Sequence, residues 1–246
     1  MEIYSRPNGH TLPAFILALG LVVAAWIGAS ALREVKLAGQ TISVKGYAER
    51  RITSDQAVWT GRFGARAKAL PGAYDKMRGD LARVQEFLSK NGVTPEQIKI
   101  SAISVSSEQG VNEKGETTFD IAGYILDQSI TVTSNDIALI EKISHNTSDL
   151  IQAGIMFNSD APQYFYTQLN NLKIEMLGEA VKDAKLRAEQ FAKHSGHDVG
   201  KLRSAQQGVF QITPEYSTEI SNSGEFDTKS VVKIMKAVVT MEFSID

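Results

Sequence analysis

Apolar residues form one uninterrupted run near the N-terminus, from Leu12 to Leu32, and this run contains no charged residue. At roughly 1.5 Å of rise per helical residue, a helix of this length covers the roughly 30 Å hydrocarbon core of a bilayer. Its large apolar side chains together contribute about −3 to −6 kcal/mol to membrane insertion. A core helix of this length would normally have a polar face. The pattern therefore predicts a transmembrane anchor at 12–32, preceded by a segment at 1–11 and followed by a tether at 33–40.

Two interpretations of this segment stay open. Ala29-Ser30-Ala31 has the small-x-small pattern of a signal-peptidase site, which would release a soluble periplasmic protein. The apolar run is nevertheless longer than the h-region of about 7–15 residues in a signal peptide, so we favour an uncleaved anchor. Arg6 precedes the run and Arg33 and Lys36 follow it, so the flanking charges hardly favour either orientation. Because long domains translocate largely regardless of charge, we expect a cytoplasmic N-terminus and an external C-terminal domain.

Beyond the tether, the chain contains stretches with the two-residue alternation of strands and stretches with the spacing of amphipathic helices. The expected strands lie at 41–51, 57–67, 98–105, 124–134, 155–157, 164–166, 202–210 and 231–245. The expected helices run from Pro71 to Asn91, from about Ile137 to Ile151, and from about Gln168 to Ser195. Asn135 or Asp136 is placed to cap the second helix, and Gly154 to end it. This order predicts an α+β domain over 41–246, with antiparallel strands and about three helices packed on one side.

Three segments between these elements carry further expectations. The apolar phase changes between Ile100 and Ile103, which predicts a bulge near Ala102. The polar segment 108–118 contains two glycines and is expected to connect the strands of a hairpin. The polar segment 211–230 is expected to be a mobile or partner-dependent loop.

The longest soluble helix carries a distinctive pattern of small residues. Alanine recurs every fourth residue from Ala180 to Ala192, which allows the helix backbone to approach a sheet or another helix closely. Gly196 follows as the expected C′ residue.

Composition narrows the chemistry that is available. The chain has no cysteine, which excludes disulfides, thiolate nucleophiles and thiolate metal sites. Its net charge is −2, so no basic field indicates nucleic-acid binding. The sequence contains no nucleophile elbow, zinc-protease motif, phosphate loop or dinucleotide fingerprint. We therefore assign no catalytic, cofactor-binding or metal-binding residue and expect no enzymatic activity.

The remaining candidates for chemistry have simpler structural interpretations. His194 and His197 lie near a helix end, where a histidine complements the helix dipole, and only Asp198 is close enough to be a third metal ligand. Asp55 is expected to form a turn by bonding to its own backbone. The aromatic run 164–166 is expected to pack as a strand rather than to form a binding face.

The chain from Thr41 to Asp246 resembles the SIMPL-domain family. The resemblance begins at Ile42-Ser43-Val44-Lys45-Gly46 and continues at Ser54-Asp55-Gln56-Ala57, where the family usually has proline in place of serine. It extends through Gly123-Tyr124 and Gly154 to the alanine helix and Gly196. The resemblance implies a bacterial envelope location, an association with oxidative-stress tolerance, and ring-like or channel-like homo-oligomers in some members. It implies no catalytic centre.

These observations lead to one hypothesis and two alternatives. We expect a single-pass protein of the bacterial inner membrane, with its C-terminal domain in the periplasm, that self-associates into a ring-like homo-oligomer with a scaffolding or stress-related role. The long expected strands at 124–134 and 231–245 would offer edges for pairing between subunits. The alternatives are an assembly that passes or sequesters a solute, and an uncharacterised enzyme or metal-binding protein. The ligand, the partner and the number of subunits stay open.

Overall fold

The computed structural model describes residues 11–37, 40–112, 114–217 and 223–245, and within the first helix the side chains of residues 15–30. The predicted segment 1–11 lies almost wholly outside the described residues, as do residues 38–39 of the tether and 218–222 of the polar segment. In the described part, the helices are α1 (Thr11–Leu37), α2 (Leu70–Lys90), α3 (Ile137–His145), α4 (Ser148–Gln152) and α5 (Leu169–Ser195), with a 3-10 turn η1 (Pro95–Gln97). The strands are β1 (Thr41–Thr53), β2 (Gln56–Ala67), β3 (Ile98–Ile100), β4 (Ser104–Val111), β5 (Thr117–Ser134), β6 (Met156–Ser159), β7 (Gln163–Phe165), β8 (Val199–Gln207), β9 (Gln211–Pro214) and β10 (Val232–Ile245).

The predicted domain at 41–246 divides into two compact units. Unit 1 contains residues 1–48, 177–208 and 237–246, and unit 2 contains residues 49–176 and 209–236. Strands β1 and β10 and helix α5 each contribute residues to both units. Because both units are assembled from segments far apart in the chain, no local pattern marks their boundary.

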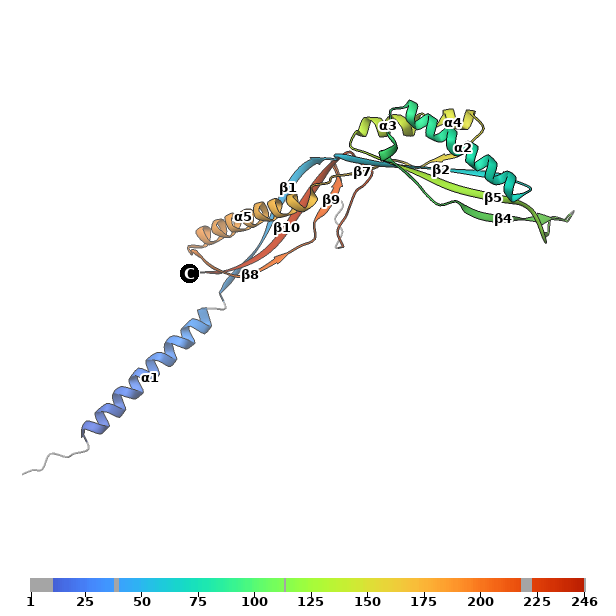
Figure 1. Cartoon of the computed structure of the whole chain (residues 1–246). Helices are drawn as coiled ribbons and strands as arrows, with labels where there is room; N and C mark the ends of the chain where they lie inside the picture. The colour runs from blue at the N-terminus through green and yellow to red at the C-terminus, as the bar shows by residue number, and fades with distance from the viewer. Residues whose placement is uncertain (1–10, 38–39, 113, 218–222, 246) are drawn as a thin grey trace, which may run out of the picture. The chain divides into compact units, whose positions relative to one another are not determined.

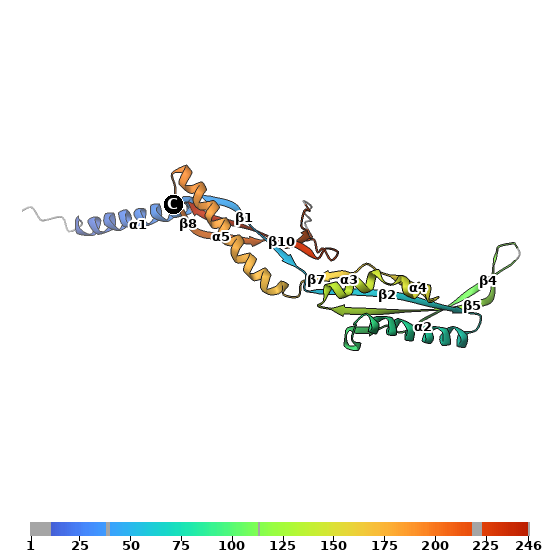
Figure 2. The ribbon, with the colours of Figure 1, turned by 90° about the horizontal axis from the view of Figure 1, so that it is seen from above.

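Unit 2 is built on a sheet with the strand order β3-β5-β2-β6, in which β4 also pairs with β5 and β7 with β2. All of these pairs are antiparallel. Helices α2, α3 and α4 cover one face of this sheet (Figures 1 and 2). The prediction of an α+β fold with antiparallel sheets is confirmed.

The covered face of this sheet contains the hydrophobic core of unit 2. Its largest fully buried side chains include Trp59 and Phe63 of β2 and Met77 of α2. The indole Nε1 of Trp59 donates to Ser159 Oγ at 2.9 Å, so the one polar atom of this ring has a partner. The amphipathic spacing that predicted this helix is confirmed, since its fully buried side chains recur three or four residues apart: Ala73, Met77, Val84 and Leu88.

Three local expectations need correction. The bulge near Ala102 is instead a break between β3 and β4, where Gln128 Nε2 donates to the carbonyl of Ser101. The expected loop at 108–118 is shorter, because β4 and β5 continue the hairpin on both sides and leave 112–116 between them. The segment 211–230 contains strand β9, which pairs with β10 and carries buried residues.

The second predicted helix also differs from the observed structure. Asp136 caps α3 as expected, since its Oδ1 accepts from the N–H of Leu139 at 3.0 Å. The helix ends at His145, and α4 begins two residues after Asn146. Asparagine and threonine favour caps and turns over helix interiors, which accounts for the interruption.

Unit 1 contains a sheet with the strand order β1-β10-β8 and the C-terminal part of α5. The alanine face of α5 is completely buried and confirms the expectation of close packing. The Cα of Gly46 in β1 lies so near the helix that an added Cβ would be 2.0 Å from Ala180 O and 2.6 Å from Ala184 Cβ. Glycine at 46 and alanines on α5 are therefore both required for this contact.

Helix α1 includes the predicted 12–32 segment and continues to Leu37, so five residues expected in the tether are helical. Arg33 to Leu37 contains mostly strong helix formers and no glycine or proline, which accounts for the extension. Among the described residues, we find no helix with both the length and the apolar character needed to cross a membrane.

We predict that Gly46→Ala lowers the stability of the full chain by about 1–3 kcal/mol, because backbone atoms of α5 would have to move to admit the methyl group. Thermal unfolding of the detergent-solubilised protein, followed by circular dichroism, measures the change. The matched control is Gly178→Ala on α5, where an added Cβ has no neighbour within 4 Å. This control should raise stability by about 0.5–1 kcal/mol. Equal effects of the two substitutions would contradict the prediction.

Candidate functional site on helix α5

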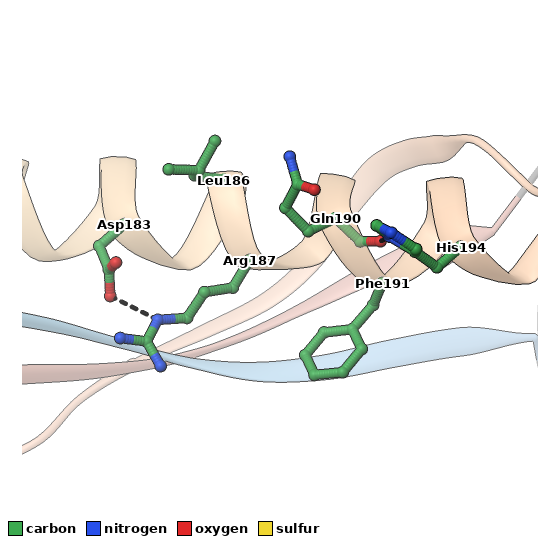
Figure 3. Close-up of a pocket in the computed structure, with 6 residues that line it drawn as sticks. All are labelled: Asp183, Leu186, Arg187, Gln190, Phe191 and His194. Atoms are coloured by element: carbon green, nitrogen blue, oxygen red, sulfur yellow. Dashed lines mark hydrogen bonds and ion pairs between the residues drawn. The ribbon is translucent and has the colours of Figure 1, made fainter.

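A hollow on the surface of unit 1 runs along helix α5. The residues lining it all belong to α5, with Leu186 and Phe191 pointing to opposite sides of the helix (Figure 3). The hollow has a volume of about 560 Å³. Its lining residues are Asp183, Leu186, Arg187, Gln190, Phe191 and His194. We call this surface the α5 face.

Asp183 connects the α5 face to the sheet. Its Oδ2 accepts from the backbone N–H of Tyr47 in β1 at 2.8 Å and from Nε of Arg187 at 2.8 Å. The hydrogen bond from Tyr47 lowers the pKa of Asp183, and Arg187 lowers it further, against the opposing effect of burial. Asp183 is therefore a carboxylate at neutral pH, and it orients the guanidinium of Arg187 across the hollow (Figure 3).

The apolar side chains of the α5 face are exposed. Leu186 is 55% exposed and Phe191 is 63% exposed. His194, one turn beyond Gln190, has its Nδ1 2.8 Å from that residue's carbonyl oxygen. The face therefore combines two uncovered apolar side chains with a cation held in a fixed position.

The histidines at the end of α5 take part in helix capping. Gly196 has a φ of +78°, and its N–H donates to Lys193 O, while the N–H of His197 donates to Ala192 O. These two hydrogen bonds form a Schellman motif, as the position of Gly196 predicted. In the part of the chain that the structure describes, no three histidine or carboxylate side chains are grouped as a metal site requires.

Asp55 does not form the local turn that the sequence predicted. Both of its carboxylate oxygens accept from Thr167, one from the backbone N–H and one from the hydroxyl, each at 2.8 Å. Its own N–H donates to the carbonyl of Phe165. Asp55 therefore links the start of β2 to the segment before α5, a partner 112 residues away that the local sequence does not reveal.

The aromatic run at 164–166 packs as a strand, as expected. Tyr164 is buried, and its hydroxyl donates to Glu141 Oε1 at 3.3 Å. Burial raises the pKa of the Tyr164 hydroxyl, and the charge of Glu141 raises it further. Tyr164 is therefore neutral and acts as a hydrogen-bond donor in unit 2.

A buried lysine, which sequence reasoning missed, lies beside Tyr164. Lys233 is 2% exposed, and its Nζ donates to the carbonyls of Tyr164 at 2.6 Å and Asp227 at 2.5 Å. Burial lowers the pKa of Lys233, and the charge of Asp227 offsets part of this effect. The signal was present in the sequence, because Lys233 falls in phase with the buried alternation of β10 that begins at Met235.

Asp227 is held as a carboxylate by the loop that contains it. Burial acts to raise its pKa, but hydrogen bonds from Ser230 and from the backbone N–H of Lys229 outweigh burial, and the charge of Lys233 adds to them. The net effect lowers the pKa of Asp227. Lys233 therefore fastens this loop to β7, because its Nζ donates both to the backbone carbonyl of Asp227 and to that of Tyr164 in β7.

The two units together define an α+β protein in which helices pack on antiparallel sheets. A family model described as SIMPL, a protein of unknown function (DUF541), matches residues 42–243. The chain belongs to the SIMPL family, which confirms the resemblance seen in the sequence. Comparison with the curated proteins finds no match.

We predict that Asp227→Asn destabilises the protein by about 1 kcal/mol at neutral pH, since asparagine retains an acceptor but loses the charge. The pKa of Asp227 is lower in the folded state than in the unfolded state, so its contribution is present above pH ~4 and is lost as pH falls through the folded-state value. Urea unfolding of the wild type and of Asp227→Asn tests this prediction. The measurements run from roughly pH 3 to pH 7, a range that includes the ordinary aspartate pKa.

The control for this experiment is Asp75→Asn, at an exposed position on α2. It should change stability little at any pH in the series. A difference between wild type and Asp227→Asn that stays constant or grows toward acid pH would contradict the assigned role.

Proposed function

We propose that this chain is a membrane-anchored, non-enzymatic protein of the bacterial cell envelope that forms a ring-like homo-oligomer with a scaffolding or stress-related role. Its N-terminus would be cytoplasmic and its C-terminal domain periplasmic. The observation that carries the proposal is the exposure of apolar side chains around helix α1. The membership of the SIMPL family is consistent with this role.

Helix α1 exposes large apolar side chains in every direction around its axis. Burying one such side chain is worth about 1.5–3 kcal/mol, so this much exposure to water is unfavourable. A helix packed on a protein core would cover one side only, whereas lipid surrounds the whole helix. The side chains concerned are between 48% and 75% exposed: Phe15, Ile16, Leu17, Leu19, Leu21, Val22, Val23, Trp26 and Ile27.

The sequence contains no catalytic motif, which supports a non-enzymatic role. Two charged side chains described above, Asp183 in unit 1 and Lys233 in unit 2, agree with this role. Asp183 is engaged by Tyr47 and Arg187, and Lys233 is engaged by two backbone carbonyls. Each therefore has a structural partner. Neither arrangement brings a nucleophile next to a general base, which catalysis by acyl or phosphoryl transfer would need.

Strand β8 supports self-association. It lies at the end of the strand order in unit 1, and its residues from 201 to 207 are all exposed. An exposed terminal strand of this length is a template for pairing with another chain. Lys201 and Arg203 would restrict that pairing to partners that accommodate positive charge.

A second candidate, an assembly that encloses a solute, is favoured by the uncovered face of the sheet in unit 2. Along β2, this face carries Thr60, Arg62 and Arg66, opposite Thr131, Ser129 and Ile125 of β5. Arg62 forms an ion pair with Asp160, and Arg66 with Glu108. A surface of hydroxyl groups and paired charges would be suitable for the polar lining of a lumen. Solute flux through liposomes that contain the purified protein would distinguish this candidate from a scaffold.

We predict that replacing both Leu21 and Val22 by arginine releases the protein from membranes. Two arginines at the centre of the helix add about 5–7 kcal/mol, which cancels the favourable insertion energy of about −3 to −6 kcal/mol. Carbonate extraction and sedimentation of bacterial membranes measure the effect. The double replacement by isoleucine is the control and should remain in the pellet. An arginine variant that stays membrane-embedded would contradict the anchor.

We predict that the full-length protein, purified in detergent, is larger than a monomer by multi-angle light scattering after subtraction of the bound detergent. A single particle with a mass that is a whole multiple of the chain mass, 26.9 kDa, is the expected result. A monodisperse monomer over the full concentration range would refute self-association.

A further inference from the structure

Four elements of unit 1 have an end at the same place. Strand β1 begins at Thr41, and the carbonyl of the preceding Gln40 accepts from the N–H of Ile245 at the end of β10. Ile245 is in turn opposite Val199, the first residue of β8, and α5 ends shortly before it, at Ser195. The start of β1, the end of α5 and the start of β8 lie together in Figure 1. We call this end of unit 1, marked by Thr41, Ile245, Val199 and Ser195, the basal end.

A short connection joins the basal end to helix α1. Helix α1 ends at Leu37 and β1 begins at Thr41, so only residues 38–40 lie between them. At about 3.3–3.6 Å per residue, even a fully extended chain keeps the Cα atoms of Leu37 and Thr41 within about 14 Å of each other. The basal end therefore stays close to the end of α1.

In the proposed anchor, the end of α1 reaches the outer surface of the bilayer. The apolar run ends at Leu32, at the edge of the hydrocarbon core, and α1 continues to Leu37. This continuation adds about 7.5 Å at roughly 1.5 Å per residue, which matches a headgroup layer of about 5–8 Å. The short connection consequently holds the basal end next to the lipid headgroups.

The basal end presents basic side chains to its surroundings. The segment from Lys193 to Lys201 connects α5 to β8, and its residues from 193 to 198 are all exposed. Lys201 and Arg203, at the start of β8, are also exposed. Within the described residues, none of these three basic side chains takes part in an ion pair.

The acidic residues near the basal end do not neutralise these side chains in the described structure. The carboxylate of Glu242 is held on the sheet, where it accepts from the hydroxyls of Thr41 and Ser204. Asp198 is exposed and forms no ion pair among the described residues, and Asp246 lies outside them. The long basic side chains can therefore extend toward an external anion, such as the phosphate of a lipid headgroup.

We infer that the basal end of unit 1 rests on the headgroups of the bilayer that holds α1, with Lys193, Lys201 and Arg203 against lipid phosphates. The inference rests on the proposed membrane anchor and adds a second contact with the same membrane. Lysine and arginine are attracted to an anionic lipid surface, and the short connection keeps them at a high effective concentration there. Unit 1 is then held in one orientation on the membrane instead of moving freely on its connection to α1.

Fluorescence quenching in nanodiscs tests this contact on the full chain, which has no natural cysteine. His197→Cys carries a fluorescent label at the basal end. The nanodiscs contain phosphatidylglycerol and phosphatidylcholine, with a nitroxide quencher attached to a fraction of the headgroups, and they should quench this label strongly. The matched control is a label on Gly178→Cys, an exposed position of α5 that lies about 26 Å along the helix from Ser195. The control label should be quenched weakly.

Charge reversal tests the role of the basic side chains. A variant with Lys193→Glu, Lys201→Glu and Arg203→Glu should lose the quenching at residue 197. Salt at about 1 M should have the same effect on the wild-type charges, because it shortens the Debye length to about 3 Å. The control makes the same change of charge at three exposed basic residues of unit 2 and should leave the quenching unchanged: Lys68→Glu, Lys76→Glu and Arg78→Glu.

Carbonate extraction of the same proteins separates this inference from the proposed anchor. If the protein stays in the membrane but the labels at residues 197 and 178 are quenched equally, the inference is wrong and the anchor stands. Quenching at residue 197 that survives both the charge reversal and the salt would also overturn the inference. Release of the wild type from the membrane would refute both proposals.

Discussion

The close contact between Gly46 and the alanine face of α5 is the constraint on which unit 1 depends. An added methyl group at residue 46 would lie 2.0 Å from the carbonyl oxygen of Ala180, so strand and helix meet almost backbone to backbone. This contact fixes the rotation of α5 about its own axis. The buried alanines determine one side of the helix, and other residues of α5, such as Leu186 and Gln190, are consequently directed to solvent.

Strand β8, at the end of the strand order in unit 1, is uncovered. Alternate residues of β10 from Met235 to Phe243 are buried, whereas β8 is exposed from residue 201 to residue 207. Unit 1 therefore has a well-packed interior and, beyond it, a terminal strand and an apolar helix face without a described partner. These are the features expected of a subunit that completes its surface by assembly.

Much of the fold could be predicted from the sequence where the signal is local. The alternation in β10, the apolar stripe of α2 and the capping by Asp136 and Gly196 all depend on residues within a few positions of one another. What could not be predicted depends on distant segments. Asp55 binds Thr167, 112 residues away, and the two units are each assembled from separate parts of the chain.

The candidate site also has a part that local sequence predicts and a part that depends on distant segments. The alanine repeat predicted which side of α5 is buried, so the solvent side could also have been inferred from the spacing. Its exposed leucine and phenylalanine were not recognised, because exposed apolar residues become informative only when the absence of a covering element is known. Lys233 was missed for a different reason. Its position in phase with Met235 predicts burial, but the carbonyls that accept its hydrogen bonds come from β7 and the 227 loop.

Cryo-electron microscopy of the full-length protein, extracted from membranes in detergent or nanodiscs, tests the central claim most directly. The account predicts a closed ring of identical subunits, with α1 helices in the lipid or detergent layer. Single chains whose α1 helix lies outside that layer would contradict it.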